Sequence, residues 1–412
     1  MGVWRFLFYA RGVNMGVKTE NKMAYEPVNK LIIQMSAPPL ISMFFQYSYN
    51  LVDSMFVAGI NEQALAAVSL AFPITTLMNA LSVWIGVGVN VLIAGYLGQK
   101  NQQKANSAAA LGVVISVVVG VLIPNMVHIV IQKILQATGN MIAPMWFQIA
   151  GVVFNFVFDP LLIFGIGPFP KMGVVGAAVA TVLGYVVSTI IALIQLFLTK
   201  QKVKPVFKNC LEPQMIKLIF SYGLPSFVMN ALGAFTVNFA NMFLVRYSDT
   251  AVAFFGAYFK VQQLIFMTVN GLIQGCLPIM RFNYRAKEYG RLKQANKSGT
   301  IIATVMMIVG MLLVLIFPKE ILFLFSASEE MCAFGVPAMR IMSLGFVFSG
   351  FSAMIATYEQ ATDSIMPGVV VQLLRQGVLL VPVIWLLNSA VQMTGIWLAF
   401  PITEFVTFLV AV

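Results

Sequence analysis

The sequence predicts an all-α, polytopic membrane protein built from two related halves. Of its 412 residues, 60% are hydrophobic and only 9% are charged, whereas soluble domains carry about 25% charged residues. The apolar residues fall in long runs, most of them at or above the ~20 residues that a helix needs to cross the hydrocarbon layer. A set of short motifs in the first half of the chain also recurs, in the same order, in the second half.

Charged and turn residues separate the apolar runs and so mark the ends of the predicted spans. About eleven spans follow, near residues 31–59, 64–97, 107–135, 141–166, 172–199, 214–246, 250–281, 298–317, 332–360, 366–387 and 392–412. Several of these runs exceed 25 residues, which indicates helices that tilt or project beyond the hydrocarbon.

The distribution of basic residues predicts the topology. The chain has 25 Lys and Arg against 14 Asp and Glu, and the basic residues gather in the N-terminal segment and in loops at 100–104, 200–217 and 281–297. Basic loops face the cytoplasm, so we expect the N-terminus and these loops to be cytoplasmic and do not expect nucleic-acid binding. An even number of spans must then separate the loops at 100 and 200, but the apolar runs supply three.

The internal repeat also indicates that a span is missing between the loops at 100 and 200. QQKAN at 102–106 resembles LKQAN at 292–296, an offset of 190 residues, whereas QATGNMIAP from Gln136 resembles QATDSIMP from Gln360, an offset of 224. The offset grows by 34 residues, so the first half lacks about one helix between Asn106 and Gln136. The remaining stretch forms either one long helix, kinked at Pro124, or a shallow re-entrant pair that breaks at Pro124 and Asn125.

The repeat also divides the chain. We expect an N-terminal extension at 1–22, with Met15 and Met23 as alternative starts, and a C-terminus that ends inside an apolar run, as a truncated chain would. The other predicted parts are an N-terminal lobe at 23–199, a cytoplasmic linker at 200–213 and a C-terminal lobe at 214–412. Parallel repeats around a central cavity are typical of transporters, which bind substrate at the interface of the repeats.

Two acids in the first lobe are the leading candidates for chemistry, because a charged group in lipid costs about 2.5–3.5 kcal/mol. They are Asp53, in NLVDSMF, and Asp159, which follows Asn155 by one helical turn. Thr181 lies in the small-residue segment GAAVATV, which favours close helix packing. These groups would supply hard oxygens for Na⁺ or a carboxylate pair that shares a proton. The alternative is that both acids lie near helix ends and are hydrated, with Pro160 marking the end of one helix.

The second lobe contributes candidate cleft or pairing residues. These are Lys260, Glu359, Arg375 and Glu404, each with a structural alternative such as a buried pair, snorkelling or solvation. An enzyme is not expected, because the chain has one histidine, three scattered cysteines and no nucleophile motif. We therefore expect no cofactor, and no metal beyond Na⁺.

Three segments resemble a known family. SAPPLISMFFQYSYNLVDSMFVAGINEQALAAVSLAFPI, PMWFQIAGVVFNFVFDPLLIFGIGPFPKMGVVGAAVAT and QLLRQGVLLVPVIWLL, the last followed by GIWLAFPITEF, are similar to multidrug and toxic compound extrusion (MATE) transporters of the bacterial cation-coupled branch. The resemblance implies twelve helices in two six-helix lobes around a V-shaped cleft, and antiport of organic cations against Na⁺ or H⁺. It implies a cation site at Asp53, Asn155 and Asp159, with Thr181 placed by loop alignment. It implies no second site, because the helix at 214–246 carries no acid.

The expected function is multidrug efflux by alternating access. We expect a monomer in the lipid bilayer of the cell membrane that acts on small cationic, amphipathic substrates. One alternative is a lipid-linked glycan flippase of a related fold, whose cleft would need more cationic side chains than Lys260 and Arg375. The other is a transport-inactive MATE remnant, because the absent residues correspond to the end of the family's third helix and most of its fourth.

Overall fold

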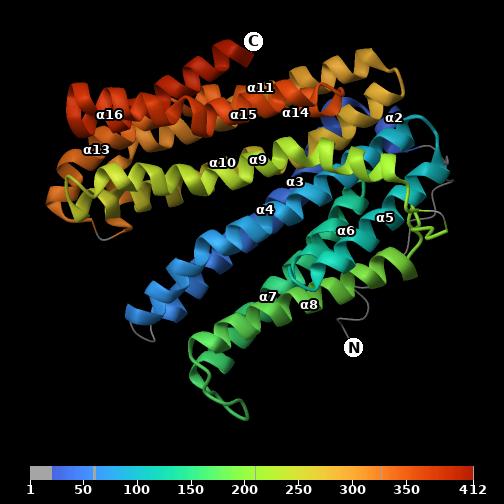
Figure 1. Ribbon diagram of the computed structural model, residues 1–412, viewed down its shortest axis with the longest axis horizontal. Helices are drawn as coiled ribbons and strands as arrows, with labels where there is room; N and C mark the ends of the chain where they lie inside the picture. The colour runs from blue at the N-terminus through green and yellow to red at the C-terminus, as the bar shows by residue number, and fades with distance from the viewer. Residues whose placement is uncertain (1–20, 59–61, 209, 326, 412) are drawn as a thin grey trace.

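The chain is almost entirely helical in the computed structural model, which describes residues 21–58, 62–208, 210–325 and 327–411 (Figure 1). The predicted all-α class is confirmed, and within the described residues nine helical segments are long and apolar enough to cross a membrane. Of the predicted N-terminal extension, residues 1–20 lie outside the described part of the chain. The helices are α2 (Lys22–Tyr25), α3 (Val28–Ala58), α4 (Glu62–Gly98), α5 (Gln102–Gly120), α6 (Met126–Ala137), α7 (Ile142–Phe164), α8 (Val174–Leu198), α9 (Pro213–Leu244), α10 (Asp249–Arg285), α11 (Tyr289–Ile316), α12 (Pro318–Phe323), α13 (Glu329–Ser343), α14 (Phe346–Ala361), α15 (Ile365–Leu373), the π-helix η1 (Leu374–Val378) and α16 (Leu380–Ala411).

The two halves repeat the same backbone features. Lys100 follows α4 with a φ of 58°, and Lys287 follows α10 with a φ of 62°. Gly139 and Asp363, at the same place in the repeated QAT motif, have φ values of 84° and 68°. Positive φ is uncommon outside glycine, so the shared positions mark equivalent helix ends. The two related lobes predicted from the sequence repeat are confirmed.

The interval between Asn106 and Gln136 forms a short helical hairpin. Helix α5 has 19 residues and α6 has 12, and a turn at 121–125 joins them. The helices pack antiparallel, with Gly120 against Val127 and Gly112 against Val130. The single kinked helix is therefore wrong, and the predicted break near Pro124 and Asn125 into a pair of helices is confirmed. That the pair is re-entrant stays a prediction. Four helices now separate the loops at 100 and 200, so the parity of the predicted topology is restored.

The hairpin reaches only part of the way along its neighbours. At its tip, the Ser82 hydroxyl donates a hydrogen bond to Asn125 Oδ1 at 2.9 Å. Ser82 lies 16 residues before the end of α4 at Gly98, about 24 Å at 1.5 Å per residue. The residues absent relative to the second half thus come from both arms of one hairpin, not from one whole helix.

The loops that carry most of the basic residues meet at one end of the bundle, here called the basic end. Gln102 Nε2 donates to the Lys202 carbonyl at 2.8 Å, and Asn140 Nδ2 donates to Gln201 Oε1 at 3.3 Å. These bonds join the loops after α4, α6 and α8. At the right of Figure 1 the helices of the two lobes converge towards this end, and towards the left they splay apart.

The lobes are in closest contact in the half of the bundle nearest the basic end. There α4 packs along α9, and α3 packs along α10. A Cβ at Gly88 would overlap the Ile219 carbonyl, and a Cβ at Gly223 would overlap the Trp84 carbonyl. Only glycine at both positions lets α4 and α9 approach to backbone contact.

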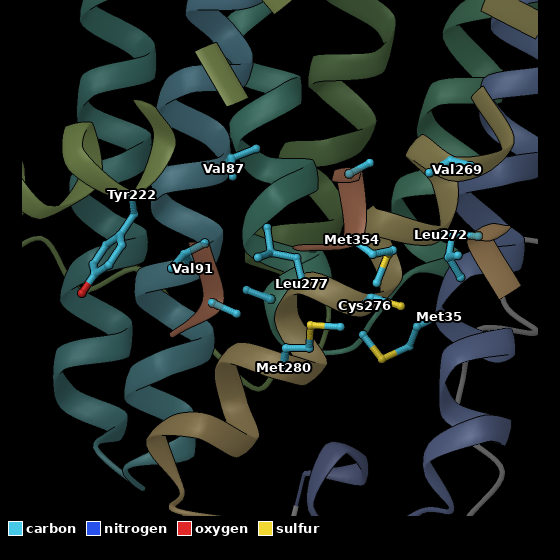
Figure 2. Close-up of a cluster of buried hydrophobic side chains, with 14 of the residues drawn as sticks. Met35, Val87, Val91, Tyr222, Val269, Leu272, Cys276, Leu277, Met280 and Met354 are labelled. Atoms are coloured by element: carbon cyan, nitrogen blue, oxygen red, sulfur yellow. The ribbon is translucent and has the colours of Figure 1, made fainter. Parts of the chain in front are cut away.

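Apolar side chains and one ion-pair network complete this seam. Figure 2 shows Leu277 and Met280 of α10 beside Val91 of α4, with Met35 of α3 near Cys276. Close to this layer, the fully buried Arg281 guanidinium bonds to Asp363 Oδ1 at 2.7 Å and to the Ala361 carbonyl at 3.0 Å. The basic end is therefore sealed by backbone, apolar and ionic contacts together.

Candidate functional site

The candidate cation site lies within the N-terminal lobe, where α3, α7 and α8 meet. Helix α3 packs along α7, and α7 packs along α8. The close approach of α7 and α8 depends on small residues, because a Cβ at Gly176 would overlap the Leu162 carbonyl and one at Gly184 would lie only 3.0 Å from the Gly151 carbonyl oxygen. The packing role predicted for the GAAVATV segment is therefore confirmed.

The structure brings the predicted acids together. Asp159 on α7 is fully buried, and Tyr49 on α3 donates a hydrogen bond from its hydroxyl to Asp159 Oδ2 at 2.9 Å. Asp53, one turn after Tyr49 on α3, is half-buried, and its carboxyl group lies close enough to that of Asp159 to share a hydrogen bond. Helix α7 continues through Pro160 to Phe164, so the alternative of a hydrated helix end is wrong for Asp159.

Three oxygens in this cluster are buried without a hydrogen-bond donor. They are Asp53 Oδ1, Asn155 Oδ1 and Asp159 Oδ1. Buried polar atoms are normally satisfied, and carboxylate and amide oxygens are the ligands that hard cations prefer. The donor set fits a monovalent cation such as Na⁺, or a proton held between the two carboxyl groups. In the described residues no group of three or more His, Cys, Asp or Glu side chains forms a metal site, and with only two acids this cluster does not contradict that finding.

Thr181 lies at the edge of the cluster. Its hydroxyl donates to the Ala177 carbonyl of its own helix at 2.9 Å, and it is close enough to the Tyr49 hydroxyl to interact with it. Thr181 therefore contacts the cluster through Tyr49. Tyr49 was not among the residues that sequence analysis selected, although its spacing of one helical turn before Asp53 was a usable signal.

The four candidates in the second lobe do not converge. Arg375 in η1 pairs with Glu404 on α16, with Nε and Oε1 2.7 Å apart, which confirms the pairing alternative for both. Lys260 is exposed on α10, so the buried pair considered for it is wrong. Glu359 is half-buried and its Oε2 has no hydrogen-bond partner. No shared cleft site is formed by these residues.

The comparisons with known proteins agree with this architecture. The sequence model of the MatE family matches residues 38–128 and 225–386, which is more than half of the chain. The chain belongs to the MatE family. Sequence similarity extends over nearly the whole length: the multidrug export protein MepA of Staphylococcus aureus (strain MSSA476) is 23% identical over 410 residues, covering 90% of this chain and 89% of MepA. MepA of Staphylococcus haemolyticus (strain JCSC1435) is 24% identical over 406 residues, covering 89% of this chain and 88% of that protein.

Solved structures show the same fold for this MatE family chain. An outward-facing conformation of a multidrug resistance MATE family transporter of the MOP superfamily superposes with a TM-score of 0.89 at 22% identity, over 97% of each chain. A MOP superfamily transporter from Pyrococcus furiosus Vc1 (DSM3638), described as having a binding pocket of reverse polarity that suggests a different function, also gives a TM-score of 0.89 at 22% identity over 97% of each chain. The family resemblance predicted from three sequence segments is confirmed.

Proposed function

We propose that this MatE family chain exports small cationic, amphipathic compounds by antiport against Na⁺ or H⁺. The observation that carries the proposal is the buried cluster of Asp53, Asn155 and Asp159, in which three oxygens lack hydrogen-bond donors. A buried carboxylate pair is costly unless a cation or a proton neutralises it. A cation that enters down its gradient releases about 2.3 kcal/mol per 100 mV of membrane potential, which is available to drive export.

The proposed mechanism is alternating access. The basic end, which the positive-inside rule assigns to the cytoplasm, is sealed where α4 meets α9 and α3 meets α10. Binding at Asp53 and Asp159 would act on this seal through α3, which carries Asp53 at one end and packs on α10 near the other. The name of a relative, the multidrug export protein MepA, supports drug export.

The two alternative functions have less support. A glycan flippase needs a cleft rich in cationic side chains, but of the two candidate cations Arg375 is paired with Glu404, which leaves only Lys260. An inactive remnant is disfavoured because the shortened hairpin is packed against α4 and retains the Ser82–Asn125 hydrogen bond. Neither alternative accounts for the buried acids of the first lobe.

The test is ethidium efflux from cells that express the chain, compared with the Asp53→Asn and Asp159→Asn variants. Both changes keep the side-chain size but remove the charge. We expect cation-dependent efflux that falls at least tenfold in each variant. As a matched control, Asp249→Asn alters an acid at the first residue of α10, and we expect it to leave efflux unchanged. Efflux that persists in both variants, or that does not depend on Na⁺ or pH in the unmodified protein, would rule out coupling through this cluster.

A further inference from the structure

A small cavity with both polar and apolar lining residues lies between the two lobes, away from the candidate cation site. It has a volume of about 50 Å³ and receives side chains from five helices. Its polar lining is formed by Asn90 of α4, Lys133 and Gln136 of α6, Ser226 of α9, Gln274 of α10 and Gln360 of α14. Because α4 and α6 belong to one lobe and the other three helices to the other, anything bound there contacts both lobes.

Lys133 is a buried lysine without an acidic partner. Only 8% of the residue is exposed, and its ammonium group donates to Gln136 Oε1 at 3.0 Å and to Gln274 Oε1 at 2.9 Å. Both acceptors are neutral amides, and an ammonium has three protons to donate. None of the ion pairs in the described part of the chain involves Lys133. An ammonium group is costly in such a site, so Lys133 retains its charge there only when a counter-charge lies beside it.

The rest of the lining favours an anion over a cation. No carboxylate lines the cavity. The Ser226 hydroxyl accepts a hydrogen bond from Gln360 Nε2 at 3.2 Å, which leaves its own proton free to donate. Asn90 Oδ1 is the one lining acceptor that is buried without a partner, and a water molecule beside an anion would satisfy it. A water needs about 10–15 Å³ of such space, so the cavity has room for both.

We propose that this interlobe cavity binds a small inorganic anion, such as chloride, through the Lys133 ammonium and the Ser226 hydroxyl. The bound anion neutralises the buried lysine and links α6 to α9 across the lobe interface. It therefore stabilises the arrangement in which the lobes are closed at the basic end. The site is separate from the carboxylate cluster on α3 and α7, and the proposal stands whether or not the chain exports drugs.

The test is the thermal unfolding of the purified full-length protein in detergent, followed by tryptophan fluorescence. Sodium chloride is compared with sodium gluconate at equal ionic strength, so that Na⁺ is constant. We expect chloride, and bromide likewise, to raise the unfolding midpoint saturably by about 2 °C or more once the anion exceeds its dissociation constant tenfold. Equal midpoints in chloride and gluconate would show that the cavity holds water only and would overturn the proposal.

Matched lysine variants assign the effect to the cavity. We expect Lys133→Met to abolish the chloride-dependent shift, and Lys200→Met, at an exposed position beyond α8, to keep it. A shift that survives in Lys133→Met would place the anion elsewhere and overturn the assignment. If Lys133→Met does not fold, bromide anomalous diffraction from the unmodified protein decides: a peak beside Lys133 supports the site, and no peak there overturns it.

Discussion

The Tyr49 hydroxyl donates a hydrogen bond to Asp159 Oδ2 at 2.9 Å and so joins α3 to α7 at the centre of the carboxylate cluster. Oδ1 of the same fully buried carboxyl group has no hydrogen-bond donor in the part of the chain that the structure describes. Tyr49 thus orients Asp159 while one oxygen remains open to a cation. This arrangement makes Tyr49 a positioning residue for the proposed site.

Removing that hydroxyl should weaken cation coupling. A hydrogen bond to a charged group contributes about 1.5–3 kcal/mol, which corresponds to roughly a tenfold to hundredfold change in affinity. We therefore expect Tyr49→Phe to raise, by at least tenfold, the Na⁺ concentration needed for half-maximal efflux, because Asp159 loses the bond that orients it. Tyr47→Phe is the matched control, because Tyr47 lies on the same helix, two residues away and outside the cluster, and it should have no such effect. An unchanged cation dependence in Tyr49→Phe would contradict the role of Tyr49.

The glycines of the α4–α9 seam should tolerate no side chain. A Cβ at Gly223 would overlap the Trp84 carbonyl, and forcing atoms into a packed interface costs about 1–3 kcal/mol. We expect Gly223→Ala to lower the thermal unfolding midpoint by several degrees. Gly256→Ala is the control on α10, where a Cβ meets nothing within 4 Å and alanine is the better helix former, so its midpoint should stay equal or rise. Equal effects of the two changes would refute backbone contact at this seam.

The Arg375–Glu404 pair should show strong coupling. The two side chains are mostly buried and their closest atoms are 2.7 Å apart, so removing one partner leaves an uncompensated charge, at a cost of about 3–5 kcal/mol. We expect Arg375→Met and Glu404→Gln each to destabilise the protein strongly, and the double variant to recover much of the loss. The measurement is a double-mutant cycle on the free energy of unfolding. Additive effects would show that the pair contributes no coupling energy.

Low pH should destabilise the protein by protonating Asp363 at the basic end. Burial by itself raises the pKa of this carboxyl group, but the Tyr222 hydroxyl and the charges of Arg281 and Arg285 together bring the pKa below its ordinary value of 3.8. A depressed pKa in the folded state contributes stability that is complete above the unfolded value and is lost as pH falls through the folded value. We expect the thermal unfolding midpoint to decrease as the pH is lowered below about 4.

The Asp363→Asn variant isolates the contribution of Asp363 to the pH dependence of stability. Asp363→Asn should lower the unfolding midpoint at neutral pH, because it removes the partner of the buried Arg281. Its further loss of stability between pH 5 and pH 3 should be smaller than that of the unmodified protein. If both proteins lose stability in parallel over that range, another acid is responsible.

Local sequence was sufficient for the spans and for the repeat. Hydrophobic runs end where charged and turn residues begin, so α7, expected at 141–166, is found at Ile142–Phe164. The jump in repeat offset located the shortened region, because the two copies must align wherever both are present. Length alone could not show that the deficit is shared by α5 and α6. Helix α5, with 19 residues, is long enough to count as a span and α6, with 12, is not. Only their packing on α4 and on each other identifies them as one hairpin.

The sequence by itself determined that the chain lies in a lipid bilayer and that its two halves are related. It also showed that Asp53, Asn155 and Asp159 are polar groups whose burial in lipid costs free energy, which made them candidates for function. A spacing of four residues fixes which side chains share a face of one helix, but not which helix lies opposite. Tertiary structure alone decided that Tyr49 meets Asp159, that Arg281 meets Asp363, and that Lys133 faces a cavity without an acid. These partners lie tens to hundreds of residues apart, and only the packing of the helices, aided by glycines such as Gly223, brings them within bonding distance.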